Sequence, residues 1–340
     1  MLWGTAAHLT QTVIAALQQA GRSSGAPRLQ LRHRHRVTEL TQQAGRISGA
    51  LAIDESSGAE QHFEAEQVVV ATGGINGSLE QVRRHWSTAA AGAAAPSELL
   101  NGAHPYADGA LHERVQALGG QVTHAGWMWN YAAGIPHPFP HFEGHGLSLI
   151  PCKSALWLDA RGERIGPEPL VTGFDTHWLC QRVAEQKQPW TWQLLNRRIA
   201  ARELAVSGAE HNPRIRDRQF LRFLFETVFG SERLLRQLQR ESPEVLVDET
   251  LAGLAAQMNA LTCTPDIEPA RLQATVDAFD ANFAAAAALH NDDQLRRILH
   301  ARQWRPDRLR TCAPAPLQSP GAGPYVAIRT QLITRKSLGG

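Results

Sequence analysis

Residues 68–74 have the sequence Val-Val-Val-Ala-Thr-Gly-Gly, and this stretch decides which fold we expect. Three successive β-branched residues followed by glycines predict a buried parallel strand that ends in a turn. A helix is expected directly after the turn, because Ser78 and Gln81 have the spacing of a capping box. In open α/β sheets the carboxyl ends of such strands line the crevice where nucleotides bind. The stretch therefore predicts an α/β fold with a ligand-binding turn at residues 71–74.

Composition and charge narrow the class of protein. The chain has 340 residues, a length that suits two domains or one large domain with an insertion. A formal net charge of +2, with no long basic block, argues against a nucleic-acid partner. The sequence contains no apolar run long enough to predict a membrane-spanning helix. Four scattered cysteines without a C-x-x-C pair, and an N-terminus without a signal-peptide pattern, favour a cytoplasmic protein.

Fifteen histidines are present, and none has the spacing of a helical metal-binding motif. His137 and His141 are four residues apart, but prolines at positions 136, 138 and 140 exclude the regular helix that would align them. We therefore expect no metal site.

Hydrophobic periodicity and turn residues predict the remaining elements. The expected strands are residues 28–40, 47–53, 61–72, 121–125 and 325–334. The expected helices are residues 7–20, 110–118, 214–239, 249–261 and 269–289, within a region, 193–300, that is predicted to be mostly helical. Runs of strands and runs of helices in one chain predict a mixed α/β protein that is α+β overall.

Many short stretches, in one order, resemble a single protein family over nearly the whole chain. They are Trp3-Gly4-Thr5, Arg34-His35-Arg36-Val37-Thr38-Glu39-Leu40, Ala71-Thr72-Gly73-Gly74-Ile75, Asp108-Gly109, Trp127-Met128-Trp129-Asn130-Tyr131, Leu156-Trp157-Leu158-Asp159, Thr172-Gly173-Phe174-Asp175-Thr176, Ser207-Gly208-Ala209-Glu210-His211-Asn212-Pro213, Met258-Asn259-Ala260-Leu261-Thr262, Gly323-Pro324-Tyr325 and Leu332 to Gly340. The chain resembles flavin-dependent dehydrogenases of the fumarate reductase / 3-ketosteroid dehydrogenase superfamily. It is most similar to the ketosteroid-dehydrogenase-like FAD-binding dehydrogenases.

This resemblance implies a Rossmann-like FAD-binding domain interrupted by a mostly helical cap that contacts substrate. Residues 1–125 and 318–340 would belong to the FAD-binding domain, and residues 126–317 to the cap. The sequence has no G-x-G-x-x-G on a strand-to-helix turn. We therefore expect an incomplete FAD-binding domain, that is, an internal fragment without the glycine-rich loop and the C-terminal flavin segment. A complementing chain would then be a partner.

The resemblance also implies which residues contact FAD. Val37 lies where relatives pair strand backbone with the adenine edge, and Asp108 matches the acidic residue of a Gly-Asp-Gly turn. The full set is Val37, Ala71, Thr72, Gly73, Gly74, Asp108, Gly109, Gly339 and Gly340. Simpler roles stay open: an ordinary strand residue for Val37, packing for the glycines, and a helix N-cap for Asp108.

Dehydrogenation next to a carbonyl needs a base for the C–H proton, a donor that polarises the carbonyl, and a hydride acceptor, which is flavin N5. Related ketosteroid dehydrogenases use tyrosines for the first two roles, so the resemblance implies Tyr131 and Tyr325. Lys336 replaces the histidine of fumarate reductases, and it would be an acid or an anion anchor. A tyrosine is otherwise a packing residue, and a lysine is otherwise a solvated one.

Aromatic residues predict the substrate class. Trp127, Trp129, Trp157 and Phe174 would line a pocket for a bulky apolar carbonyl compound such as a steroid, unless they form hydrophobic core. Phe174 occupies the position of the arginine proton donor of fumarate reductases, which disfavours that activity. The resemblance thus implies an FAD-dependent dehydrogenase of CH–CH bonds beside a carbonyl. The alternative is a non-catalytic piece of such a flavoprotein.

Overall fold

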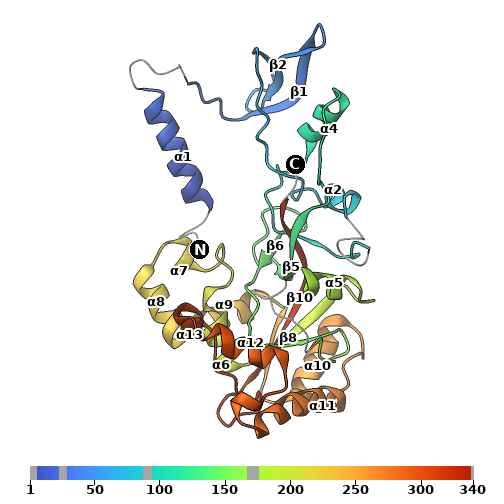
Figure 1. The fold of residues 1–340 in the computed structure, drawn as a ribbon, viewed down its shortest axis with the longest axis vertical. Coiled ribbons are helices and arrows are strands. Elements are labelled where there is room, and N and C mark those ends of the chain that lie inside the picture. Colours follow the sequence, from blue (N-terminus) through green and yellow to red (C-terminus); the bar gives the residue numbers. More distant parts are fainter. Residues whose placement is uncertain (1–5, 23–28, 87–93, 167–175, 338–340) are drawn as a thin grey trace. The chain divides into compact units, whose positions relative to one another are not determined.

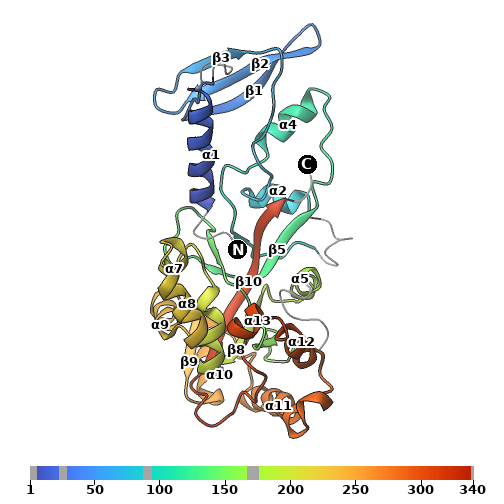
Figure 2. The same cartoon turned by 60° about the vertical axis from the view of Figure 1, so that its left-hand side comes forward.

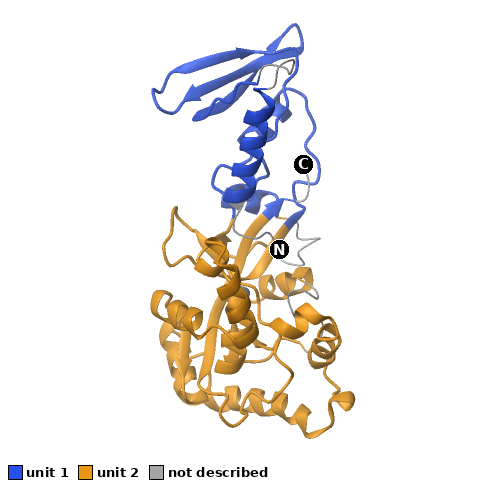
Figure 3. Ribbon diagram, turned by 90° about the vertical axis from the view of Figure 1, so that its left-hand side faces the viewer, with its two compact units in different colours: residues 1–85, 103–128, 336–340 blue, residues 86–102, 129–335 orange. Residues whose placement is uncertain are grey.

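The computed structural model describes residues 6–22, 29–86, 94–166 and 176–337 (Figure 1). The chain divides into two compact units (Figure 3). Unit 1 consists of residues 1–85, 103–128 and 336–340, and unit 2 consists of residues 86–102 and 129–335. Both contain helices and strands, which confirms the mixed α/β class. The assignment of residues 1–125 and 318–340 to one domain stays a prediction.

The sheet of unit 1 is a three-stranded antiparallel meander (Figure 2). Its strands, in the order β1-β2-β3, are β1 (His35–Gln43), β2 (Arg46–Asp54) and β3 (Glu60–Glu64). Ala44 and Gly45 both have positive φ angles, as a tight hairpin turn between β1 and β2 requires. The predicted order of three strands separated by turns is therefore confirmed.

Local signals in the sequence fix the helices of unit 1, which are α1 (Ala6–Ala20), α2 (Leu79–Arg84) and α4 (Ala110–Ala117). Ser78 caps α2 by accepting a hydrogen bond from the backbone N–H of Gln81 at 3.3 Å. Asp108 accepts one from the N–H of Ala110 at 3.0 Å, at the start of α4. The helices predicted over residues 7–20 and 110–118 are confirmed.

The strand predicted at residues 68–70 is wrong. Residues 67–74 have no regular secondary structure, and the side chain of Val69 is 89% exposed. Three β-branched residues favour extended backbone, but a strand also needs a neighbour for its hydrogen bonds. No strand among the described residues pairs with this segment. The strand predicted at residues 121–125 is wrong for the same reason.

The sheet of unit 2 has seven strands, and β10 (Tyr325–Ser337) lies at its centre (Figures 1 and 2). The order along the main path is β6-β5-β10-β8-β7, and β4 and β9 also pair with β10. The other strands are β4 (Leu100–Asn101), β5 (Met128–Pro136), β6 (Gly146–Ser148), β7 (Leu156–Leu158), β8 (Trp190–Asn196) and β9 (Val245–Asp248). The strand predicted over residues 325–334 is thus confirmed. Residues 193–196, predicted to be helical, end β8 because pairing with β10 overrides local preference.

Helices pack around this sheet. They are α5 (Thr176–Ala184), α6 (Arg197–Glu203), α7 (Pro213–Arg216), α8 (Phe220–Phe229), α9 (Glu232–Glu241), α10 (Leu251–Thr262), α11 (Pro269–Asp280), α12 (Asp293–Ala301) and α13 (Arg305–Arg310), with 3₁₀ turns η1 (Leu204–Val206), η2 (Ala281–Ala284) and η3 (Ala287–Leu289). The single helix predicted over residues 214–239 is three helices, because the chain takes positive φ angles at Arg218 and Gly230. No helix within the described ranges is long and apolar enough to cross a membrane.

Ile333 on β10 fills a socket formed by three glycines, Gly102, Gly134 and Gly146. Its side chain is fully buried. A Cβ atom on Gly102 or Gly146 would lie 2.7 or 2.8 Å from Ile333 Cδ1, and one on Gly134 would lie 2.6 Å from Ile333 Cβ. Such distances are too short for any side chain, so close packing around Ile333 requires glycine at all three positions.

Candidate functional site

Two turns of unit 1 that the sequence singles out lie against each other. Gly77, just after residues 71–74, donates its backbone N–H to the carbonyl of Ala107 at 2.8 Å. A Cβ on Gly109 would lie 2.8 Å from Ile75 Cγ2. The turn at residues 71–74 and the turn that opens α4 therefore form one surface.

The two glycines of the 71–74 turn have different surroundings. A Cβ on Gly74 would lie 2.1 Å from Ser337 Oγ, which itself accepts the N–H of Ile75 at 3.1 Å. Gly74 is therefore required for packing against the end of β10. Gly73 has a φ of +82°, and the nearest atom to a Cβ there would be the Cβ of Ala107, at 3.8 Å. At Gly73 glycine is needed for the left-handed backbone, and the space beside it is open.

The backbone of this turn is available to a ligand. Ala71, Thr72 and Gly73 are exposed. No hydrogen bond joins the backbone of residues 71–74 to another residue that the structure describes. Exposed N–H and C=O groups on a glycine turn are what a protein offers to a nucleotide that it holds by main-chain contacts. This turn can therefore offer main-chain groups to a ligand of that kind.

Val37 lies on β1, the edge strand of the meander, and is half-buried. The register shifts between Val37 and Glu39, which makes Thr38 the extra residue of a β-bulge. An edge strand leaves unpaired backbone groups on its outer side, as pairing with an adenine edge would require. Glu39 pairs with Arg114 of α4 at 3.0 Å, which ties β1 to the helix that Asp108 and Gly109 open. Gly339 and Gly340 lie outside the described residues.

Trp129 and Tyr131 lie on one face of β5 in unit 2, because they are two residues apart on a strand. Their ring centroids are 6.5 Å apart, Trp129 is 45% exposed, and Tyr131 is half-buried. An aromatic surface with a phenol at its edge can pack against an apolar molecule and donate one hydrogen bond to it.

The structure does not bring Tyr131 and Tyr325 together. Strand β4 runs parallel to β10, and an isolated β-bridge between Asn101 of β4 and His145, just before β6, is also parallel. Strand β5 is antiparallel to β6. Strand β5 therefore runs antiparallel to β10. Gly134 contacts Ile333, so Tyr131 lies still nearer the end of β10, whereas Tyr325 is its first residue. More than eight residues of strand, about 26 Å, separate the two tyrosines.

The electrostatics argue against Tyr325 as a base. Burial raises the pKa of Tyr325, and the carboxylates of Asp280 and Asp277 raise it further. A phenol with a raised pKa is a poor base near neutral pH. Tyr325 is therefore a poor candidate for the base.

The remaining predicted substrate and catalytic residues are Trp127, Trp157, Phe174 and Lys336. Trp127 (59% exposed) and Lys336 (exposed) belong to unit 1, and Phe174 lies outside the described residues. The prediction that Trp157 lines a pocket is wrong. Its side chain is 1% exposed, and its Nε1–H donates to Thr191 Oγ1 at 2.8 Å inside the sheet of unit 2.

A cluster that the sequence did not predict lies in the β5–β6 hairpin. The N–H of His137 donates to the carbonyl of His145 at 2.9 Å, and the two rings stack at 4.3 Å. Side-chain ligand atoms of His137, His145 and Glu210 lie within 4.8 Å of one another. The prolines do exclude a helix here, but hairpin closure brings these histidines together without one. Only the register of β5 with β6 would have revealed this from the sequence.

The tautomers of these histidines argue against metal coordination. The backbone N–H groups of Phe139 and His141 donate to Nδ1 of His137 and of His145. Burial lowers the pKa of both imidazoles, so both are neutral at pH 7 and carry their proton on Nε2. His145 Nε2 is the atom that faces Glu210, at 3.9 Å. A histidine that binds a metal through Nε2 needs a free lone pair on Nε2 and a proton on Nδ1.

Comparison with known proteins places the chain in a family. Residues 1–340 match the family described as FAD binding domain. The chain belongs to this family, within the FAD-dependent oxidoreductase superfamily, and its cofactor is FAD. The family resemblance found in the sequence is thus confirmed.

Particular relatives are steroid dehydrogenases by name. The chain is 34% identical over 352 residues to a KsdD-like steroid dehydrogenase of Mycolicibacterium smegmatis, which covers 99% of the chain and 62% of that protein. It is 32% identical to a KsdD-like steroid dehydrogenase of Mycobacterium tuberculosis, over 99% of the chain and 60% of that protein. The chain thus spans about three fifths of the length of the curated relatives that it matches.

One solved structure shows the same fold. The 3-ketosteroid delta1-dehydrogenase of Sterolibacterium denitrificans, in complex with 1,4-androstadiene-3,17-dione, aligns with a TM-score of 0.57 and 15% identity. The alignment covers 89% of this chain and 48% of that one.

Proposed function

We propose that this chain serves an FAD-dependent dehydrogenase that oxidises a CH–CH bond beside the carbonyl of an apolar, steroid-like substrate. The single observation that carries the proposal is the exposed turn at residues 71–73, whose backbone is not bonded to any described residue. The family supplies the cofactor for which this turn is suited. The curated relatives, named as steroid dehydrogenases, supply the substrate class.

Residues of unit 1 would hold the cofactor. Ala71, Thr72 and Gly73 would offer main-chain groups to the adenosine side, and the edge of β1 at Val37 would offer others. Asp108 is exposed beside the turn, where its carboxylate could accept a ligand hydroxyl. When bound, FAD supplies the hydride acceptor at N5. Gly109 and Gly74 would support this surface by packing.

Residues of unit 2 would recognise the substrate. The Trp129 ring would cover an apolar face of the substrate, and the Tyr131 hydroxyl would donate a hydrogen bond to its carbonyl oxygen. Such a donor stabilises the negative charge that grows on that oxygen as the neighbouring C–H proton leaves. Tyr325, at the far end of β10, would not take part, and roles for Trp127, Phe174 and Lys336 stay predictions.

The test is to add FAD to the purified chain and then a 3-ketosteroid without oxygen, following the flavin absorbance. We expect FAD to bind, and we expect the steroid to bleach it when a complementing chain supplies the glycine-rich loop and the C-terminal flavin segment. Tyr131→Phe should slow bleaching at least about a hundredfold while FAD binding is unchanged, because only the polarising hydroxyl is lost. Tyr325→Phe is the matched control and should bleach at the original rate. Failure to take up FAD contradicts the cofactor role of this chain, and bound FAD that no ketosteroid reduces contradicts the substrate class.

The cofactor turn has its own test in Gly73→Val. The side chain would fill the open space beside the turn, so we expect FAD affinity, measured by titration, to fall at least about tenfold. Gly58→Val is the matched control, since Gly58 has a φ of +73° and equally open surroundings in the β2–β3 turn. Both variants carry similar backbone strain. Equal losses of FAD affinity would show that strain, rather than ligand contact, is responsible.

A further inference from the structure

Helix α8 exposes its apolar residues and buries its acidic one. Five large apolar side chains are between 44% and 79% exposed, and we call them the α8 apolar face: Phe220, Leu221, Leu224, Phe225 and Phe229. Glu226, in the same helix, is 9% exposed. A helix on the surface of a globular unit ordinarily has the opposite orientation. An exposed apolar face of this size marks an interaction surface.

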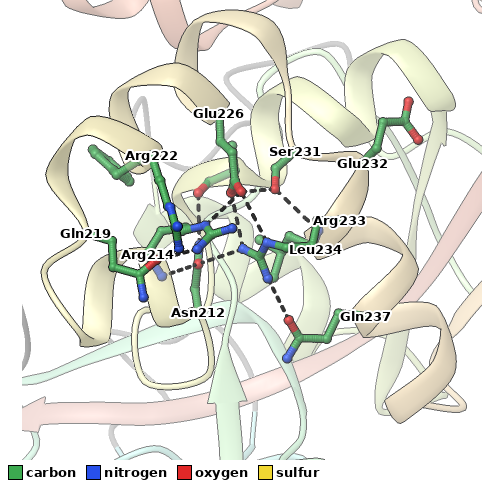
Figure 4. Close-up of polar contacts among 12 residues, drawn as sticks. Asn212, Arg214, Gln219, Arg222, Glu226, Ser231, Glu232, Arg233, Leu234 and Gln237 are labelled. Carbon is green, nitrogen blue, oxygen red and sulfur yellow. Dashed lines mark hydrogen bonds and ion pairs between the residues drawn. The ribbon is translucent and has the colours of Figure 1, made fainter.

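The orientation of α8 is fixed by Glu226 (Figure 4). Its carboxylate accepts hydrogen bonds from Arg214 Nε at 2.9 Å, Arg233 Nε at 3.1 Å and Ser231 Oγ at 2.7 Å. A rotation of α8 that buried the apolar face would break all three contacts and leave two guanidinium groups without their partner. The α8 apolar face is therefore held outward by a buried ionic network.

The surroundings of this face are basic. Residues 213–229 contain four arginines and two acids, and one of the acids is the buried Glu226. Arg218 and Arg222 are exposed, and the other acid, Asp217, pairs with Arg216 at 2.7 Å. Helix α13, which contacts α8, adds exposed Arg305 and Arg308.

We propose that the α8 apolar face docks on the headgroup region of an anionic lipid bilayer. Phenylalanine and leucine side chains insert shallowly, and the flanking arginines contact lipid phosphates. The charge of the rim selects this occupant over a second copy of the chain. A two-fold contact would bring the arginines of both copies together, and a stable protein interface needs more residues than one ten-residue helix supplies. This inference goes beyond the proposed function and does not rest on it.

The test is co-sedimentation of the 340-residue chain with lipid vesicles. We expect binding to phosphatidylcholine vesicles that contain about one third phosphatidylglycerol, and weaker binding to phosphatidylcholine alone. Leu221→Glu with Phe225→Glu should lower the partition coefficient at least about tenfold, because two inserted side chains become charged. Arg222→Gln should lower it about fivefold, and only on the anionic vesicles.

Leu289→Glu is the matched control, because Leu289 is 72% exposed and lies on η3 rather than on α8. It should bind within about twofold of the unchanged chain, since it removes no inserted side chain. Circular dichroism and thermal unfolding establish that each variant is folded. The proposal is overturned if the unchanged chain ignores anionic vesicles, or if the Leu221/Phe225 double variant binds them equally well. It is also overturned if light scattering shows a dimer that this variant abolishes while no vesicle binding occurs.

Discussion

Replacing Ile333 by alanine is expected to destabilise unit 2 by about 4 kcal/mol. The side chain is fully buried at the centre of the sheet, and the glycine socket of Gly102, Gly134 and Gly146 closes around it. Glycines have no side chains that could move into the space, so most of the cavity would remain. Urea unfolding followed by tryptophan fluorescence measures the change in the free energy of unfolding. A loss below about 1 kcal/mol would show that Ile333 is not held by its socket.

A double-mutant cycle tests the socket atom by atom. Ile333→Val removes Cδ1, which a Cβ on Gly146 would meet at 2.8 Å, and leaves Leu100 Cβ, which it would meet at 2.7 Å. Gly146→Ala should therefore destabilise less in the valine background, with a coupling of about 0.5 kcal/mol or more. Gly134→Ala is the control, because its Cβ would meet Ile333 Cβ and Gln331 O, which valine leaves in place. Its effect should be additive with that of Ile333→Val.

Replacing Glu226 by glutamine is expected to destabilise the protein by about 3 kcal/mol at neutral pH. The Glu226 side chain is 11% exposed, and the paired side chains of Arg214 and Arg233 are 17% and 35% exposed. Removal of the carboxylate leaves both guanidinium groups partly desolvated without a charge partner. Urea unfolding at pH 7 measures this loss.

The loss of stability caused by Glu226→Gln should become smaller as the pH falls. Burial acts to raise the pKa of Glu226, but the hydrogen bonds from Arg233, Arg214 and Ser231 outweigh it, so the pKa lies below its ordinary value of 4.5. A depressed carboxyl pKa contributes stability above pH 4.5, and this contribution is lost as pH falls through the pKa of the folded state. The difference between Glu226→Gln and the unchanged chain should therefore shrink below pH 4.5.

Glu232→Gln is the control for this prediction. Glu232 pairs with Arg197 at 2.8 Å, but the two side chains are 38% and 53% exposed. An exposed ion pair contributes about 1 kcal/mol or less, since water already solvates both charges. If the two glutamine variants lost the same stability, the buried network would not be what orients α8.

Local sequence signals predicted those parts of the fold whose causes are local. The β1–β2–β3 meander follows from its turn residues. Helix α2 follows from the cap at Ser78, and α4 follows from the turn in which Asp108 accepts the N–H of Ala110. Valines 68–70 have the right propensity for a strand but no described partner. Residues 193–196 have a partner, β10, that lies far away in the sequence, and no local pattern reveals it.

The candidate site likewise has some features that sequence motifs predicted and others that only the strand arrangement decides. The turn at residues 71–74 was predicted from its own sequence pattern and the turn at Asp108 through a family motif, and the two turns lie together in unit 1. The motifs could not show that Tyr131 and Tyr325 lie near opposite ends of one sheet, because that depends on strand direction. They also could not show that His137 stacks on His145, because hairpin register decides it.

The order of the strands has a consequence for how the protein is made. β10 pairs with β4, β5, β8 and β9, and it follows all of them in the sequence. Ile333 pairs with Leu100, so the loop that this contact closes contains most of the chain. During synthesis the earlier strands emerge before β10, so their apolar faces stay uncovered until β10 pairs with them. We therefore expect nascent chains of this protein to expose apolar strand surfaces until synthesis has passed β10.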